Sequence, residues 1–212
     1  MKRLLVIPIY LFSLICVGQT NDNLKLVGDY TKSDSIRVYE SYSTVIEAVN
    51  LMRNDIESIW HVGSHSGDKK KEIRIKNWND NETFLRWMGK PDKIGMVHRK
   101  IIRIHSKLKK RLILEVSKKN RGRCTGWISA WAIPYGKVRI VLCEDFFMYR
   151  THLQEKVIIH ELGHEAGMFS HRNIHGCRAA KRAASSNKNV AKRSPENYAW
   201  LAMSYLGLEC GH

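Results

Sequence analysis

The most constraining stretch of this sequence is the run His160-Glu-Leu-Gly-His164, which follows Val157 and two isoleucines. Residues four apart lie on one face of a helix, so the two histidines project side by side. The branched apolar residues ahead of them predict a buried helix, where an uncompensated polar cluster would be costly. Gly167 can end this helix and turn the chain back. The stretch therefore predicts a buried helix that carries a polar site.

The His-Glu-x-x-His spacing is typical of catalytic zinc sites. The neutral imidazoles of His160 and His164 can bind one tetrahedral Zn²⁺ ion. Glu161 is rotated about 100° around the helix from His160, so its carboxylate can reach a water on the metal without competing as a ligand. Zinc lowers the pKa of such a water toward ~7, and the glutamate accepts its proton during attack on a carbonyl. Glu165 is unusual, because an uncharged residue is more common after the second histidine.

The third metal ligand is less obvious from the spacing. Zinc enzymes use three protein ligands, and the pattern H-E-x-x-H-x-x-G-x-x-H would place the third at Ser170. His171 follows directly, and His175 comes soon after. We expect one of these two histidines to complete the site, and a surface position is the alternative for either.

The N-terminus has the pattern of a secretory signal peptide. Lys2 and Arg3 precede an apolar run over residues 4–17, which is short for a membrane span of ~20 residues. We expect residues 1–18 to be removed and the protein to be secreted, either periplasmic or extracellular. An uncleaved anchor is the alternative, and no other transmembrane segment is expected.

Four of the five cysteines lie beyond this segment, and an even number in an exported protein favours disulfides. We expect Cys124 to pair with Cys143, and Cys177 with Cys210. No C-x-x-C pair is present, so the cysteines do not indicate a zinc site.

The chain has 36 Lys and Arg residues against 20 Asp and Glu residues, a formal net charge of +16. Such a charge can attract an anionic surface. The basic residues are spread along the chain without interleaved aromatics, so a solvated basic surface is the preferred interpretation. We expect no specific nucleic-acid partner, and a monomer.

Elsewhere the pattern is mostly helical, and residues 19–43 are expected to form a loosely structured leader. Helical spacing of apolar residues occurs over residues 43–60, 81–89, 93–114, 151–167 and 194–207. Residues 137–143 alternate and are β-branched, which predicts a strand, with residues 127–132 as its candidate hairpin partner. His61 and His65 are also four apart, but nearby glycines favour a loop over a metal site. His98 is expected at the surface or core edge of its helix.

Four segments in this order carry a family resemblance: VRIVLCEDFF, VIIHELGHEAG, IHGC and SPENYAWLA. Together they resemble the deuterolysin family of zinc endopeptidases, the aspzincins. The resemblance extends from about residue 40 to the C-terminus and is strongest over residues 124–205. It implies an α+β, mostly helical, zincin-like fold with a small β-sheet beside the H-E-x-x-H helix. It also implies a single catalytic domain over residues 44–212, with a helical part (44–118) and a part holding the sheet and zinc site (119–212).

The resemblance implies that His160 and His164 are zinc ligands and that Glu161 is the catalytic acid/base. The family's third ligand is an aspartate in a D-x-x-Y-G element, and this chain departs from that pattern. His175 falls at the tyrosine position, and Arg172, which cannot ligate zinc, falls at the aspartate position. The preferred interpretation makes His171 the third ligand and gives His175 the tyrosine's role of polarising the substrate carbonyl.

Two alternatives remain open: His175 is itself the ligand, or the element has decayed and zinc binds weakly or not at all. The preference of some relatives for lysine after the cut is not transferred, because the acidic residue of the element is missing. The predicted function is a secreted Zn²⁺-dependent endopeptidase acting on protein or peptide substrates. The alternatives are a zinc amidase acting on cell-wall peptides and a non-catalytic basic binding protein with a structural zinc.

Overall fold

The computed structural model describes residues 23–117, 123–124, 128–133, 137–168, 174–186 and 189–208. The elements in chain order are β1 (Leu24–Val27), α1 (Lys32–Trp60), α2 (Gly67–Asn79), α3 (Glu82–Met88), α4 (Ile94–Leu108), β2 (Leu112–Ser117), β3 (Ala130–Ala132), β4 (Arg139–Cys143), α5 (Glu144–Met148), α6 (Thr151–Glu165), α7 (Cys177–Ser185), the 3₁₀ helix η1 (Ala191–Arg193) and α8 (Pro195–Ser204). The predicted α+β, mostly helical fold with a small sheet is confirmed.

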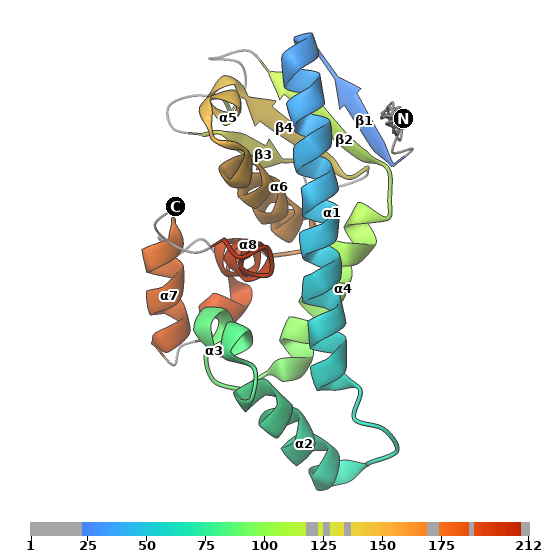
Figure 1. Cartoon of the computed structure of the whole chain (residues 1–212), viewed down its shortest axis with the longest axis vertical. Helices are drawn as coiled ribbons and strands as arrows, with labels where there is room; N and C mark the ends of the chain where they lie inside the picture. The colour runs from blue at the N-terminus through green and yellow to red at the C-terminus, as the bar shows by residue number, and fades with distance from the viewer. Residues whose placement is uncertain are drawn as a thin grey trace, which may run out of the picture.

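The four described strands form one mixed sheet in the order β1-β2-β4-β3. β1 and β4 both run parallel to β2, whereas β3 is antiparallel to β4 and forms one edge of the sheet. Figure 1 shows the sheet and α2 at opposite ends of the molecule, with α1 running along the length between them. The predicted hairpin of β3 and β4 is confirmed.

The prediction of a loosely structured leader over residues 19–43 is wrong for residues 23–43, the part that the structure describes. Residues 24–27 form β1, and α1 begins at Lys32 rather than at residue 43. Thr31 caps the helix, because its side-chain oxygen accepts a hydrogen bond from the Asp34 amide at 3.0 Å. The apolar face extends further toward the N-terminus than expected, since Val38 is fully buried. The partner of β1 is β2, which lies far away in the sequence and leaves no local pattern.

The helix expected over residues 93–114 is too long. α4 ends at Leu108, and residues 112–117 form β2, between β1 and β4. Leu112 and Leu114 are fully buried and alternate with less buried neighbours, which is the period of a strand. α2 was not predicted, because Trp78 is its one buried residue and the helix therefore has no apolar stripe.

The disulfide between Cys124 and Cys143 is confirmed and joins the segment before β3 to the end of β4. Cys177 is also disulfide-bonded. Its predicted partner Cys210 lies outside the described residues, as does the predicted signal peptide. In the described part of the chain, no helix has the length and apolar character needed to cross a membrane.

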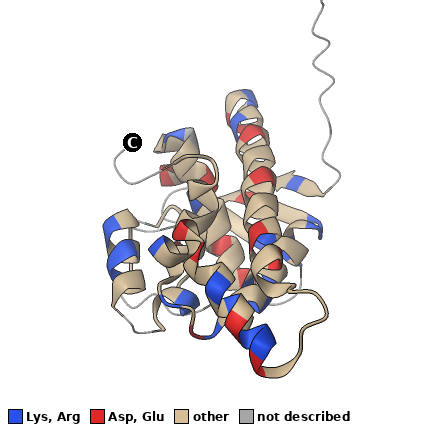
Figure 2. Cartoon of the chain, turned by 60° about the horizontal axis from the view of Figure 1, so that its bottom comes forward, with Lys and Arg blue, Asp and Glu red and all other residues tan. Residues whose placement is uncertain are grey.

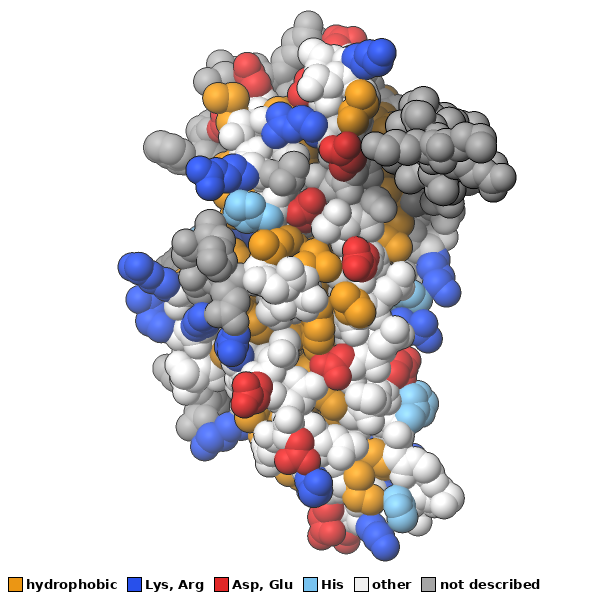
Figure 3. Space-filling model, viewed as in Figure 1, with side chains coloured by type: hydrophobic (Ala, Val, Ile, Leu, Met, Phe, Trp, Pro, Cys, Tyr) orange, Lys and Arg blue, Asp and Glu red, His pale blue; other side chains and the backbone are white. Residues whose placement is uncertain are grey.

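Basic side chains are distributed over several helices and are interspersed with acidic ones (Figure 2). On the face shown in Figure 3, lysines and arginines are scattered rather than gathered into one patch. This distribution fits a solvated basic surface better than a dedicated nucleic-acid groove.

Candidate metal centre

Helix α6 brings His160, Glu161 and His164 together. One ligand atom from each lies within 4.8 Å of those of the other two. His160 and Glu161 are buried, with 8% and 7% of their surface exposed, and His164 is half-buried. The helical spacing seen in the sequence therefore produces a compact group of two imidazoles and one carboxylate.

Each imidazole is oriented by a hydrogen bond at its Nδ1 atom. Nδ1 of His160 lies 2.8 Å from Oε2 of Glu196, and Nδ1 of His164 lies 2.6 Å from the carbonyl oxygen of Met168. Such partners fix the tautomer and the ring orientation of metal-binding histidines. The Nε2 atoms are consequently the nitrogens that would coordinate a metal ion.

Glu196 is a site residue that sequence reasoning missed. It lies in the first turn of α8 and is 1% exposed. Oε1 accepts hydrogen bonds from the Gly176 amide at 2.9 Å and from the Trp200 indole at 3.0 Å, and it pairs with the Lys156 ammonium at 2.8 Å. Burial alone would raise the pKa of Glu196, but the hydrogen bond from His160 and the charge of Lys156 outweigh it and lower the pKa to about 2. Glu196 is therefore an ionised acceptor for His160.

Gly163, between the two histidines, allows α8 to approach. A Cβ atom on this glycine would lie 2.9 Å from Cβ and 3.2 Å from Cα of Pro195. Pro195 directly precedes Glu196, so this close approach brings the carboxylate to His160. The sequence shows a glycine inside the predicted helix, which can mark a close approach of another segment. It does not show that this segment is the start of α8.

The Glu161 carboxylate contacts the edge strand of the sheet. Its Oε2 atom accepts a hydrogen bond from the Ala132 amide at 2.8 Å. Burial raises the pKa of Glu161 to about 8, although the Ala132 hydrogen bond and the charge of Lys156 act in the opposite direction. In the absence of a cation, the protonated form of this carboxyl is therefore favoured near neutral pH.

The unusual Glu165 is paired with another helix. Its carboxylate lies 3.2 Å from Nζ of Lys107 on α4, and 4% of its side chain is exposed. This pairing compensates the charge that made the position unusual in the sequence.

A cavity of about 470 Å³ opens beside the group, between the segment that includes β3 and the exposed side of α6. His175 is exposed and lines this cavity, together with His160, Glu161, His164 and Glu196. His171, the preferred third ligand, lies outside the described residues. The structure thus brings together three of the five predicted site residues and places a fourth at the same cavity.

Protein-family models give no match to this sequence, and no curated protein matches it significantly. Among solved structures, the zinc peptidase from Grifola frondosa superposes with a TM-score of 0.62 and 14% sequence identity. The superposition covers 84% of this chain and 98% of that chain. This chain has a zinc-peptidase fold. The fold implied by the family resemblance is therefore confirmed.

Within this zinc-peptidase fold, the residues present fit a zinc ion. Zinc prefers imidazole nitrogens as ligands, and both imidazoles here have fixed Nδ1 partners. The adjacent buried carboxyl of Glu161 is suited to accept and donate a proton. Burial raises the pKa of Glu161 above the range expected for a base at neutral pH. A cation bound close to this carboxyl would favour its ionised form and lower that pKa.

Proposed function

We propose that this protein is a secreted zinc-dependent endopeptidase. The observation that carries the proposal is the grouping of His160, Glu161 and His164 on α6, beside a cavity bordered by the sheet-edge strand β3. The zinc-peptidase fold supports it independently.

In this proposal His160, His164 and His171 hold the zinc. A zinc ion held there would supply a water of lowered pKa and would polarise the scissile carbonyl. Glu161 accepts the proton of the attacking water and passes it to the departing amine nitrogen. The Ala132 amide holds Oε2 of Glu161 at 2.8 Å, so the carboxyl keeps one orientation during both proton transfers.

His175 is exposed and lines the cavity, which supports a role in contacting substrate. We propose that it donates a hydrogen bond to the carbonyl oxygen as negative charge develops there. If His175 instead binds the metal, this donor must come from another residue.

Strand β3 offers a binding edge for an extended peptide. The Ile133 amide bonds to the Arg139 carbonyl, and the Cys143 amide bonds to the Ser129 carbonyl. Alternation along an antiparallel strand then directs the main chain of Ala130 and Ala132 toward the opposite edge. The Ala132 amide already donates to Glu161 there, so a peptide would use the Ala130 amide and the carbonyl oxygens of the two alanines. A peptide that adds to this edge would lie along the cavity, which suits an endopeptidase because the chain can extend on both sides of the scissile bond.

The substitution Glu161→Gln tests the proposal. We expect zinc content and fold to be retained and cleavage of unfolded casein to fall by about 10²–10⁴-fold, the usual contribution of a general base. Glu144→Gln, at an exposed position on α5, is the matched control and should retain activity.

Purified cell-wall fragments are the second substrate in this assay. Cleavage of these fragments without cleavage of casein would identify an amidase instead. If wild-type protein loaded with zinc hydrolyses neither substrate, the endopeptidase proposal fails, and a structural zinc in a basic binding protein becomes the better interpretation.

A further inference from the structure

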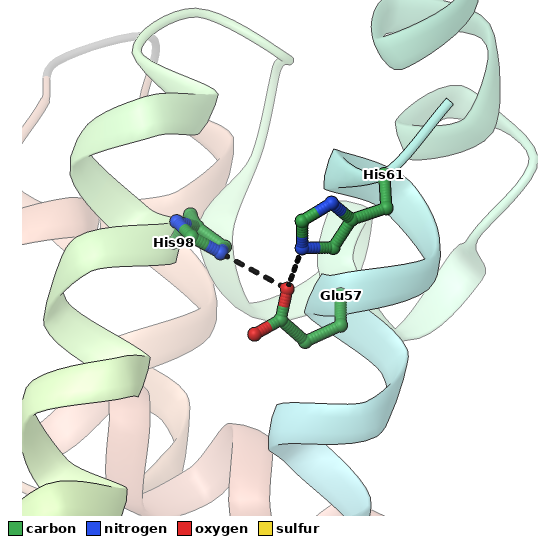
Figure 4. A group of neighbouring side chains, drawn as sticks. All are labelled: Glu57, His61 and His98. Atoms are coloured by element: carbon green, nitrogen blue, oxygen red, sulfur yellow. Dashed lines mark hydrogen bonds and ion pairs between the residues drawn. The ribbon is translucent and has the colours of Figure 1, made fainter. Parts of the chain in front are cut away.

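A second group of metal-binding side chains lies between the C-terminal end of α1 and the first half of α4. Glu57 and His61 are one helical turn apart on α1 and its C-cap, and His98 projects from α4 (Figure 4). One ligand atom from each lies within 4.8 Å of those of the other two. None of the three lines the cavity beside His160.

The two imidazoles converge on a single carboxylate oxygen. Nε2 of His61 lies 2.7 Å from Oε2 of Glu57, and Nε2 of His98 lies 3.2 Å from the same oxygen (Figure 4). Ligands bound at 2.0–2.1 Å in a tetrahedral zinc site are separated by about 3.3 Å. The two nitrogen–oxygen distances, 2.7 and 3.2 Å, are near that separation, and the two imidazole nitrogens lie within 4.8 Å of each other.

The inner side of this group is held in place by packing. The His98 ring stacks on Trp60 with centroids 4.7 Å apart and an angle of 14° between the rings. The guanidinium of Arg74 covers the Trp60 ring at 3.4 Å and donates to the Trp60 carbonyl oxygen at 2.9 Å. The rotamer of His98 is thereby restricted, which reduces the entropy lost on binding an ion.

The outer side of the group is open to solvent. The His61 side chain is 73% exposed, compared with 23% for Glu57 and 16% for His98. An ion can therefore enter past His61, and water can supply a fourth ligand. Arg53 lies 4.0 Å from the other carboxylate oxygen of Glu57, and its charge opposes the ion without occupying the shared oxygen.

We propose that Glu57, His61 and His98 form a second metal site, for Zn²⁺, separate from the site on α6. Two imidazoles and one carboxylate form a donor set typical of zinc, whereas Ca²⁺ and Mg²⁺ prefer sites made of oxygen ligands. The bound ion links the end of α1 to α4. It therefore stabilises the part of the molecule from which α2 projects, remote from peptide hydrolysis.

Equilibrium dialysis of the full chain against Zn²⁺ tests this site, with bound zinc measured per chain above about pH 7, where imidazoles are mostly neutral. His61→Ala is the principal variant, because its exposed side chain can be removed with little effect on packing. Glu57→Gln is the second. His65→Ala, an exposed histidine on the same loop, is the matched control.

We expect His61→Ala and Glu57→Gln each to bind one zinc fewer than wild type, and His65→Ala to bind the wild-type amount. Zinc should also raise the Tm less in the two site variants than in the control. Equal zinc content in wild type and His61→Ala would overturn the proposal, as would a wild-type protein that binds no zinc. The comparison is between variants, so it gives an answer whether or not the site on α6 is a peptidase centre.

Discussion

Oε2 of Glu196 lies 2.8 Å from Nδ1 of His160, and this contact joins the first turn of α8 to the helix that carries the candidate zinc ligands. The same carboxylate forms an ion pair with Lys156 and accepts a hydrogen bond from the Gly176 amide. One buried acid thus connects α6, α8 and the residue after His175. The orientation of the metal site depends on tertiary contacts as much as on the His-Glu-x-x-His motif.

Glu196→Gln should weaken zinc binding by about 10–100-fold, the range found when the outer partner of a metal-binding histidine is removed. The amide keeps the volume of the side chain but removes the negative charge that makes His160 a stronger ligand. Titration against a competing chelator measures the effect. Glu40→Gln, an exposed position on α1, should bind zinc as tightly as wild type. An unchanged affinity for Glu196→Gln would show that this contact does not support the metal site.

Gly163→Ala should destabilise the protein by about 1–3 kcal/mol, the usual cost of overpacking a core. The added Cβ would meet Cβ of Pro195 at 2.9 Å and push α8 away from α6. Chemical denaturation gives the change in the free energy of unfolding.

We also expect weaker zinc binding in Gly163→Ala, because the displacement moves Glu196 from His160. In a double-mutant cycle, Glu196→Gln should then cost less zinc affinity in the Gly163→Ala background than in wild type. Additive effects on zinc affinity would mean that the glycine does not act through Glu196.

The third ligand can be assigned by measuring zinc per chain in His171→Ala and His175→Ala. We expect His171→Ala to lose the metal. We expect His175→Ala to retain zinc and lose casein cleavage, because its proposed role is to polarise the substrate carbonyl. Loss of zinc in His175→Ala alone would reverse the two roles.

Glu155 on α6 makes stability depend on pH. It is 6% exposed, and burial raises its pKa from 4.5 to about 7. Below the unfolded pKa both states are protonated, so ionisation of this group costs no stability. As the pH rises above the unfolded pKa, the unfolded state loses its proton before the folded state does. The free energy of unfolding therefore falls until the pH has passed the folded pKa.

Glu155→Gln should therefore stabilise the protein at about pH 8, by up to about 3 kcal/mol, and have little effect at about pH 4. Thermal unfolding of variant and wild type at both pH values measures the difference. Glu144→Gln, on the exposed side of α5, should show no such dependence on pH. A stabilisation of equal size at the two pH values would contradict the assignment to ionisation.

Some features of the site were predictable because their signals are local. The spacing of His160 and His164 requires only a helix, and the pair Ser194-Pro195 indicates where α8 begins. The position of Glu196 was not predictable in this way. An acid in the first turn of a helix is ordinary in any sequence, and only the approach of α8 at Gly163 turns it toward His160.

The amino-acid sequence by itself determined the helix that holds the candidate zinc site, the strand β4, its hairpin partner β3 and the disulfide between Cys124 and Cys143. It did so because periodicity and spacing act over a few residues. The tertiary structure decided the pairing of β1 with β2, the contact of Glu196 with His160, and the meeting of Glu57 with His98. Periodicity shows which face of an element is buried, whereas the partner of that face is chosen by the packing of the whole chain.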